Sequence, residues 1–299
     1  MEKTNLNALI NLLDDPDEEV FFNVKENLLS LGTHIIPDLE KAWEQSLDEN
    51  YQERIENIIQ KIQYRSTKNE LENWNHNFKN DLLKGAYLLA KYQYPDLDFQ
   101  VLDEQITQIK KDVWLEINDN LTALEKVKIL NHILFEVHGF LQNKTNFYSP
   151  QNSYINYVLE SKKGNPISLA IIYLVVARRL RLPIFGVNLP KNFILAYVDE
   201  HGYFNPFTDS NENVLFYINP YNKGAVFGKK DIEHFIKIQK LKPQKSYFAP
   251  CSNSVIIFRL IEHLILSYKK LGYPDKIEDL NNLLELLDHG INSGDFSNG

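Results

Sequence analysis

The sequence predicts a helix-rich α+β fold in which one buried helix packs on a small antiparallel sheet, with α-helical units on either side. Apolar residues recur at helical spacing through much of the first 140 residues and again after residue 252. Between residues 164 and 197, an apolar run has the composition of a buried helix followed by two short strands. Gly and Pro mark the ends of these segments.

The N-terminal region predicts a small helical unit. Its first helix is expected to end at the turn 14–17, and a second helix to cover 18–31, with Gly32 at its C-terminal end. A third helix begins near Pro37. Because so few helices cannot bury their apolar faces alone, we expect them to stack against a further helix at 51–64.

Three longer helices are expected next, at 71–92, 99–117 and 123–141. The apolar stripe of the last helix indicates core packing, not a ligand site. His132 and His138 lie six residues apart on this helix, so they point to opposite faces, where two metal ligands would not meet. We interpret them as ordinary, partly buried histidines.

The buried helix is expected at 167–180. Asn165 suits its N-cap, because its side chain can accept a free backbone N–H, and Pro166 suits the first helical position. A short apolar strand, a turn at 188–190 and a second strand at 193–198 follow.

The rest of the sheet is expected to follow a hairpin turn at 199–202. A returning strand at 203–207 and a strand at 214–218 complete it. Two helices, 252–271 and 276–287, carry facing leucine stripes and predict a C-terminal helical hairpin.

Several segments carry a family resemblance: 140–143, 148–154, 158–160, 164–197 and 222–224. They resemble the transglutaminase-like superfamily, in particular its SirB-type branch of bacterial proteins, over about residues 84 to 236. The resemblance implies a papain/transglutaminase-like core, with a catalytic Cys at the start of the buried helix, a His at the start of a strand and an Asp on the strand after it. Residues 13–39 resemble a HEAT-like repeat, and 267–272 resemble part of a tetratricopeptide (TPR) helix.

The positions that match this triad carry other residues. They are Pro166 at the nucleophile, Asn192 at the general base and Asn219 at the orienting Asp. Proline has no nucleophilic atom, and an amide takes up no proton near neutral pH. The sequence therefore predicts a degenerate triad with no catalytic residue.

Two interpretations of the amide side chains remain open. Asn188, Asn192 and Asn219, together with Asn165 and Ser168 at the helix start, form a candidate binding site for a carboxylate or a peptide backbone. Alternatively, the amides hydrogen-bond one another where the triad would be, which is the interpretation we favour.

Other candidate residues have simpler explanations. Ser168 lies nearest the nucleophile position, but a Ser at the third helical position commonly bonds back to the cap, and without a His partner it is a poor nucleophile. His201 lies on a Gly-containing turn, where we expect a solvated residue and not a displaced base. Arg181 replaces a Gly that the resemblance implies before Leu-Pro, at a small expected cost in stability.

Composition excludes several classes. The 299 residues carry a net charge of −8, which argues against a nucleic-acid or anionic-membrane surface. A single cysteine, Cys251, excludes an internal disulfide and a thiolate metal cluster. The N-terminal residues lack the apolar core of a signal peptide, and the longest apolar run, 167–177, is too short for a membrane helix. We expect a cytoplasmic protein without a cofactor or metal.

These observations predict three parts: a HEAT-like helical unit at 1–66, a transglutaminase-like core at 67–236 and a TPR-like hairpin at 237–299. We expect a non-catalytic protein-interaction or regulatory module, a pseudoenzyme with a protein or peptide partner. The alternative is an amide or ester hydrolase, or an acyltransferase, that uses a non-standard residue such as Ser168.

Overall fold

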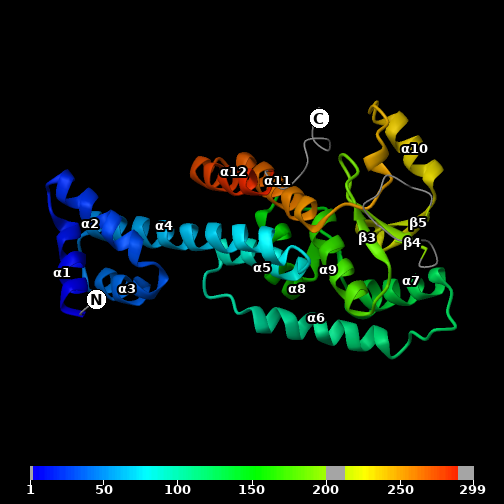
Figure 1. Ribbon diagram of the computed structural model, residues 1–299, viewed down its shortest axis with the longest axis horizontal. Helices are drawn as coiled ribbons and strands as arrows, with labels where there is room; N and C mark the ends of the chain where they lie inside the picture. The colour runs from blue at the N-terminus through cyan, green and yellow to red at the C-terminus, as the bar shows by residue number, and fades with distance from the viewer. Residues whose placement is uncertain (1–2, 200–212, 289–299) are drawn as a thin grey trace. The chain divides into compact units, whose positions relative to one another are not determined.

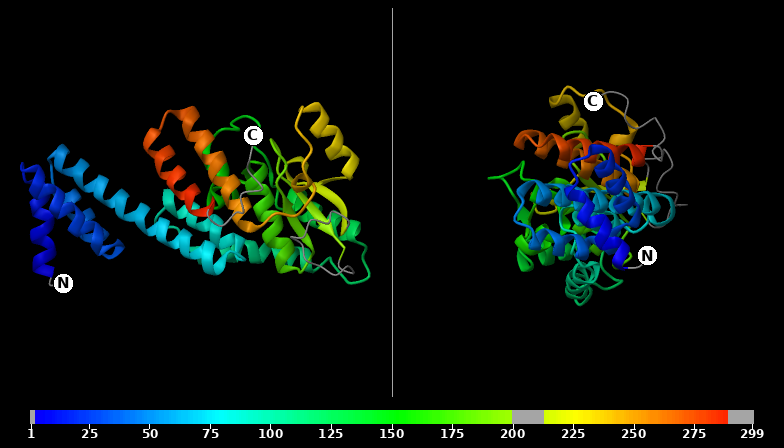
Figure 2. Two further views of the ribbon diagram at one scale, coloured as in Figure 1. Left: turned by 45° about the horizontal axis from the view of Figure 1, so that its top comes forward. Right: turned by 90° about the vertical axis from the view of Figure 1, so that its left-hand side faces the viewer.

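A computed structural model describes residues 3–199 and 213–288 of the chain (Figures 1 and 2). Contacts divide the chain into two compact units, residues 1–71 and 72–299. The predicted boundary after residue 66 lies inside a helix, and the C-terminal hairpin falls within the second unit. Most of the predicted hairpin 199–207, with His201, lies outside the described residues.

The first unit is built from helices whose apolar faces share one core. In order they are α1 (Lys3–Asn11), η1 (Leu12–Asp14), α2 (Glu18–Leu31), η2 (Thr33–Ile35), α3 (Ile36–Gln45) and α4 (Glu49–Asn73). The expected stacking on the fourth helix is confirmed, since Ile55, Ile58 and Ile62 of α4 pack in that core. The Arg54 guanidinium donates to the Leu13 carbonyl at 2.8 Å and so fixes the turn after α1.

Most of the second unit is helical. Its helical segments are η3 (Trp74–Phe78), α5 (Leu82–Gln93), α6 (Phe99–Trp114), α7 (Ala123–Asn131), η4 (His132–Val137), η5 (Pro150–Ser153), α8 (Ile155–Ser161), α9 (Pro166–Arg179), η7 (Pro220–Asn222), α10 (Lys229–Ile238), η8 (Lys245–Tyr247), α11 (Asn253–Leu271) and α12 (Pro274–Asp288).

Two predicted helices are shorter than expected. The helix predicted at 71–92 is broken before α5, because the Asp81 side chain accepts the Lys84 N–H at 3.0 Å and begins a new helix there. The Trp74 indole N–H donates to the Asp81 carbonyl at 2.7 Å and holds the break in place. The helix predicted at 123–141 ends at Val137, after which the chain turns at Gly139 with a positive φ.

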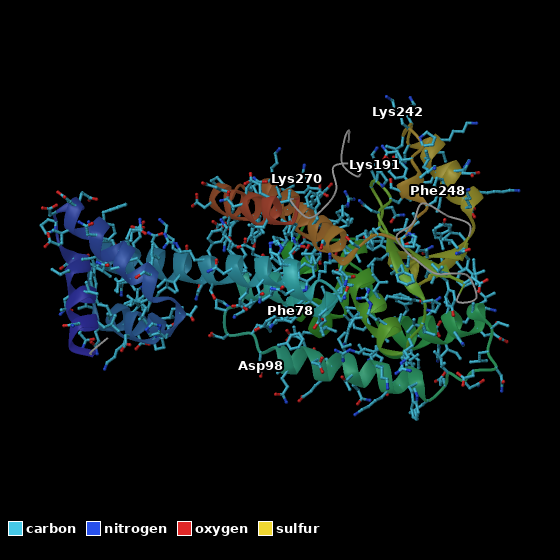
Figure 3. All side chains as sticks on the ribbon, in the orientation of Figure 1. Phe78, Asp98, Lys191, Lys242, Phe248 and Lys270 are labelled. Carbon is cyan, nitrogen blue, oxygen red and sulfur yellow. The ribbon has the colours of Figure 1, made fainter. Side chains whose placement is uncertain are left out.

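The sheet has four antiparallel strands in sequence order: β3 (Ile184–Val187), β4 (Ile194–Val198), β5 (Val214–Asn219) and β6 (Ala225–Phe227). One face, with Val187, Ile194 and Tyr217, packs against α10 and the segment around Phe248 (Figure 3). A separate parallel pair joins β1 (Leu141–Gln142) to β2 (Lys163–Gly164). No sequence pattern predicted β1, β2, β6, α8 or α10.

Helix α9 lies at the centre of the second unit (Figure 1). It contacts α5, α6, α8, α11 and strands β3 and β4, and its residues from Ile167 to Ala177 are all buried. Its C-terminal end is held by charge, since Arg179 pairs with Asp103 and donates to the Thr107 hydroxyl at 2.7 Å. The fold is therefore the predicted helix-rich α+β fold, with one buried helix on a small antiparallel sheet and helices around it.

A buried polar link ties α9 to the turn between β5 and β6. The Tyr173 hydroxyl donates to the Asn131 side-chain oxygen at 3.0 Å, and the Asn131 amide donates to the Gly224 carbonyl at 2.8 Å. Gly224 has a φ of 71°, and a Cβ there would overlap the Asn131 amide. The turn after Asn219 therefore requires glycine at this position.

We expect Gly224→Ala to lower the free energy of unfolding by about 2–4 kcal/mol, because the new Cβ displaces Asn131 and strains a left-handed backbone. Gly228→Ala is the matched control, since a Cβ at Gly228 would meet only the Asp231 carboxylate, at 3.8 Å. Urea denaturation followed by circular dichroism measures both. Equal loss in the two variants would contradict the role given to Gly224.

Arg181 follows the C-terminal end of α9 with a φ of 58°, a region that glycine adopts without strain. We expect Arg181→Gly to raise the free energy of unfolding by about 0.5–1 kcal/mol, the relief of strain less the entropy that glycine adds to the unfolded chain. Arg181→Ala keeps the strained backbone and should give no such gain. A variant Arg181→Gly that is less stable than Arg181→Ala would contradict this expectation.

Candidate functional site

The start of α9 is closed by its own cap. As predicted, Asn165 is the N-cap: its side-chain oxygen accepts the N–H groups of Ile167 at 2.9 Å and Ser168 at 2.8 Å. The Ser168 hydroxyl oxygen in turn accepts the Asn165 N–H at 3.0 Å. Asn165 and Ser168 are 1% and 0% exposed. Both are therefore engaged in holding the helix end and are screened from solvent.

Two residues that the sequence analysis did not single out complete this cluster. The Asn165 side-chain amide donates to the Ser153 hydroxyl at 2.8 Å, and His263 of α11 places Nδ1 3.2 Å from both groups. Because the amide nitrogen can only donate, Nδ1 acts as an acceptor and the ring proton is assigned to Nε2. Within the described residues, that buried Nε2 has no hydrogen-bond partner.

The environment of His263 keeps the ring neutral. Burial, and secondarily the positive charge of Arg259, lower the pKa of His263 from 6.5 to about 4. A general base works best with a pKa near the working pH, so His263 is a weak base at neutral pH. Ser153 is only 1% exposed, which keeps substrates from its hydroxyl. The contact therefore brings a serine and a histidine together without the properties of an activated nucleophile.

The other two triad positions lie at one end of the sheet. β4 and β5 pair Leu195 with Ile218, so Asn219 comes beside Ile194, two residues from Asn192. Segment η7, which follows Asn219, packs on α9. The structure thus brings the Asn192 and Asn219 positions to the same sheet end, and η7 links that end to the helix that begins at Pro166.

The amide side chains at this end do not bond to one another. The Asn219 side-chain oxygen accepts the Asn222 N–H at 3.3 Å and caps η7. Among the described residues, no hydrogen bond joins the side chains of Asn188, Asn192 and Asn219. All three are partly exposed, so they remain available to a ligand, unlike Asn165 and Ser168.

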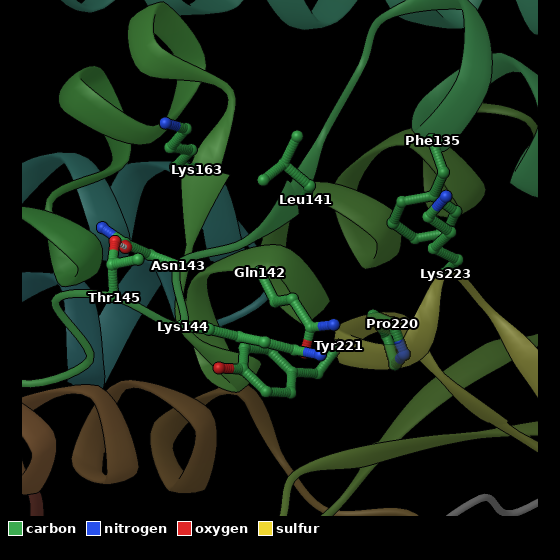
Figure 4. Close-up of a pocket in the computed structure, with 10 residues that line it drawn as sticks. All are labelled: Phe135, Leu141, Gln142, Asn143, Lys144, Thr145, Lys163, Pro220, Tyr221 and Lys223. Atoms are coloured by element: carbon green, nitrogen blue, oxygen red, sulfur yellow. Dashed lines mark hydrogen bonds between the residues drawn. The ribbon is translucent and has the colours of Figure 1, made fainter.

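A pocket of about 420 Å³ opens directly beyond Asn219 (Figure 4). Its walls come from the end of η4, from β1 and the loop after it, from β2 and from η7. Its lining residues are Phe135, Leu141, Gln142, Asn143, Lys144, Thr145, Lys163, Pro220, Tyr221 and Lys223. The pocket could not be predicted from the sequence, because its residues are spread over almost 90 positions and share no motif.

The remaining candidates lie elsewhere. His132 bonds to Glu136 and His138 to Asp112, each at 2.8 Å. His138 is partly buried as expected, whereas His132 is exposed. In the part of the chain that the structure describes, no three His, Cys, Asp or Glu side chains group as metal ligands would. The described helices include none with the length and apolar character needed to cross a membrane.

The low pKa of His263 predicts a pH-dependent stability. In the unfolded chain the imidazole binds its proton near pH 6.5, but in the folded chain only near pH 4, so folding is opposed as the pH falls through this interval. We expect His263 to remove about 2 kcal/mol of stability between pH 7 and pH 5. Above pH 6.5 this cost is absent.

Urea denaturation of the wild type and of His263→Gln at several pH values measures this contribution. Carboxylates titrate alike in both proteins, so the difference between their free energies of unfolding isolates His263. The wild type should lose stability relative to the variant as the pH falls from 7 to 5. A difference that stays constant over that interval would contradict the assigned environment.

Comparison with known proteins shows the family to which the chain belongs. Residues 100–262, more than half of the chain, match the profile described as the transglutaminase-like superfamily. A UPF0162 protein of Xylella fastidiosa (strain 9a5c) is 30% identical over 201 residues, which cover 65% of this chain and 67% of the relative. A second, from strain Temecula1, is 38% identical over 121 residues, 40% of this chain and 43% of the relative.

A more distant relative is larger. Human F-box only protein 21 is 26% identical over 157 residues, which cover 52% of this chain and 24% of that protein. The chain thus matches only part of the length of each of these relatives. No solved structure is significantly similar to it. The profile match and the UPF0162 relatives show that the chain belongs to the transglutaminase-like superfamily, in its UPF0162 family.

Proposed function

We propose that this protein is a non-catalytic, SirB-type member of the superfamily that acts by binding a protein or peptide partner. The observation that carries the proposal is the residue set at the three triad positions, Pro166, Asn192 and Asn219. Acyl transfer by a cysteine enzyme needs a thiolate, a base that takes its proton and a group that orients the base. Pro166 cannot form a thiolate and Asn192 cannot take up its proton, so an orienting amide at Asn219 would have no base to orient.

The nearby hydroxyls offer no substitute. Ser168 is buried and committed to the helix cap, and Ser153 is buried against Asn165. Among the described residues, His263 is the imidazole that hydrogen-bonds a serine, and its pKa is too low for an efficient base at neutral pH. These features disfavour the alternative of an amide or ester hydrolase, or an acyltransferase, that uses Ser168.

The surroundings of the core suit an interaction role. We infer that the N-terminal unit is HEAT-like and the α11–α12 hairpin TPR-like, since helical repeats of both kinds present extended binding surfaces. Phe22 and Trp43 of the N-terminal unit are 58% and 37% exposed, and aromatic side chains of this kind are common in binding surfaces. We expect the partner to be a cytoplasmic protein.

An activity screen tests the non-catalytic assignment. The purified protein is treated with thiol-directed and serine-directed activity probes and with model amide and ester substrates, with and without an acceptor amine. We expect no labelling or turnover above that of Ser153→Ala and Ser168→Ala, because neither of these buried serines has an efficient base to activate it. Turnover that disappears in either serine variant, while the variant keeps its circular dichroism spectrum, would overturn the proposal.

A further inference from the structure

The pocket beside η7 concentrates positive charge on an acidic protein. The chain has 40 acidic and 32 basic residues, yet the pocket lining holds Lys144, Lys163 and Lys223 and, among the described residues, no acidic side chain. All three lysines are exposed, and they come from three separate segments of the chain (Figure 4). Such a cluster attracts anionic groups and disfavours cationic ones.

One wall of the pocket is also an open strand edge. β1 pairs with β2 through alternate residues: the Leu141 N–H donates to the Lys162 carbonyl at 2.8 Å, and the Asn143 N–H donates to the Gly164 carbonyl at 3.0 Å. In a parallel pair, the residue between two such donors directs its own N–H and C=O to the opposite side. Gln142 is that residue and lines the pocket. Within the described residues, β2 is the sole strand partner of β1.

The remaining lining gives the pocket an apolar part. Leu141 is 41% exposed, and Pro220 and Tyr221 line the pocket from η7. The volume of about 420 Å³ falls within the range of pockets that take small ligands or a few side chains. The pocket thus combines a backbone edge, an apolar surface and three cations.

We propose that this pocket binds an extended acidic peptide segment of a partner protein. The peptide backbone pairs with the free edge at Gln142, and its Asp or Glu carboxylates lie against Lys144, Lys163 and Lys223. Strand addition of this kind uses main-chain hydrogen bonds for affinity and side-chain pockets for specificity. The inference rests on the proposed binding function and gives the partner its chemistry.

The open edge favours a peptide over other anions. A free phosphate or a nucleotide would use the lysines but could not pair with both the N–H and the C=O of a strand residue in register. Nucleic acid is also disfavoured by the net charge of −8 on the whole chain.

Fluorescence polarisation with a labelled peptide tests the site on the full-length protein. The probe is a capped peptide of alternating Glu and Val, which is extended, acidic and apolar on one face. Its comparison peptides carry Gln in place of Glu, or N-methyl groups on alternate residues that remove backbone donors but keep the charge. We expect the acidic peptide to bind. The affinity of the N-methylated peptide and that of the Gln peptide should each be at least about tenfold lower.

A matched pair of variants separates the pocket from overall charge. The pocket variant carries Lys144→Glu, Lys163→Glu and Lys223→Glu. The control variant carries Lys111→Glu, Lys128→Glu and Lys237→Glu, which reverse three other exposed lysines with the same change in net charge. The pocket variant should lose at least about tenfold in affinity and the control less than about threefold, because charges outside the site act through a screened field.

Several outcomes would overturn the assignment: no binding by the wild type, equal losses in the two triple variants, or equal binding of the N-methylated peptide. Complete displacement of the probe by millimolar inorganic phosphate would show a small-anion site instead. The proposed function is tested separately, because only turnover in the activity screen would overturn it. Absent turnover together with absent peptide binding removes the pocket assignment alone.

Discussion

The cap of α9 is the interaction on which the second unit depends. A helix buried along its whole length can leave no polar group unpaired at its start, because each unpaired buried N–H costs free energy comparable to a lost hydrogen bond. Asn165 and Ser168 satisfy these groups reciprocally, and Ser153 and His263 satisfy Asn165 in turn. These partners come from η5, just before α8, and from α11, which therefore pack at this closed helix end.

The same closure bears on function. In a reaction centre at a helix start, the positive end of the helix dipole must face a reacting group. Here the capping amide uses that end, and Pro166 suits the first helical turn. The start of α9 therefore serves to stabilise the helix. The sheet end at Asn192 and Asn219 keeps its place beside the helix, and the charged pocket lies immediately past it.

The cluster that stabilises the start of α9 and the pocket proposed to bind a peptide are therefore separate sites. The Asn165 cluster is buried, and among its described side-chain atoms His263 Nε2 lacks a hydrogen-bond partner. The pocket beside η7 is cationic and bounded by the β1 edge, for which the described part of the chain supplies no further strand partner. Hydrogen bonds from Tyr173 to Asn131 and from Asn131 to Gly224 connect α9 with the pocket. They attach the turn that contains Lys223 to the middle of α9.

Sequence alone determined the parts that depend on neighbouring residues: the cap and first turn of α9, strands β3 to β5, and the helical hairpin of α11 and α12. Capping, periodicity and side-chain chemistry act over a few residues and can be seen in a short window. The tertiary structure decided the rest. The break before α5 depends on Trp74 reaching Asp81, and the Ser153–His263 contact and the three-lysine pocket join residues far apart in the chain. Such contacts follow from how whole elements pack, which no local pattern specifies.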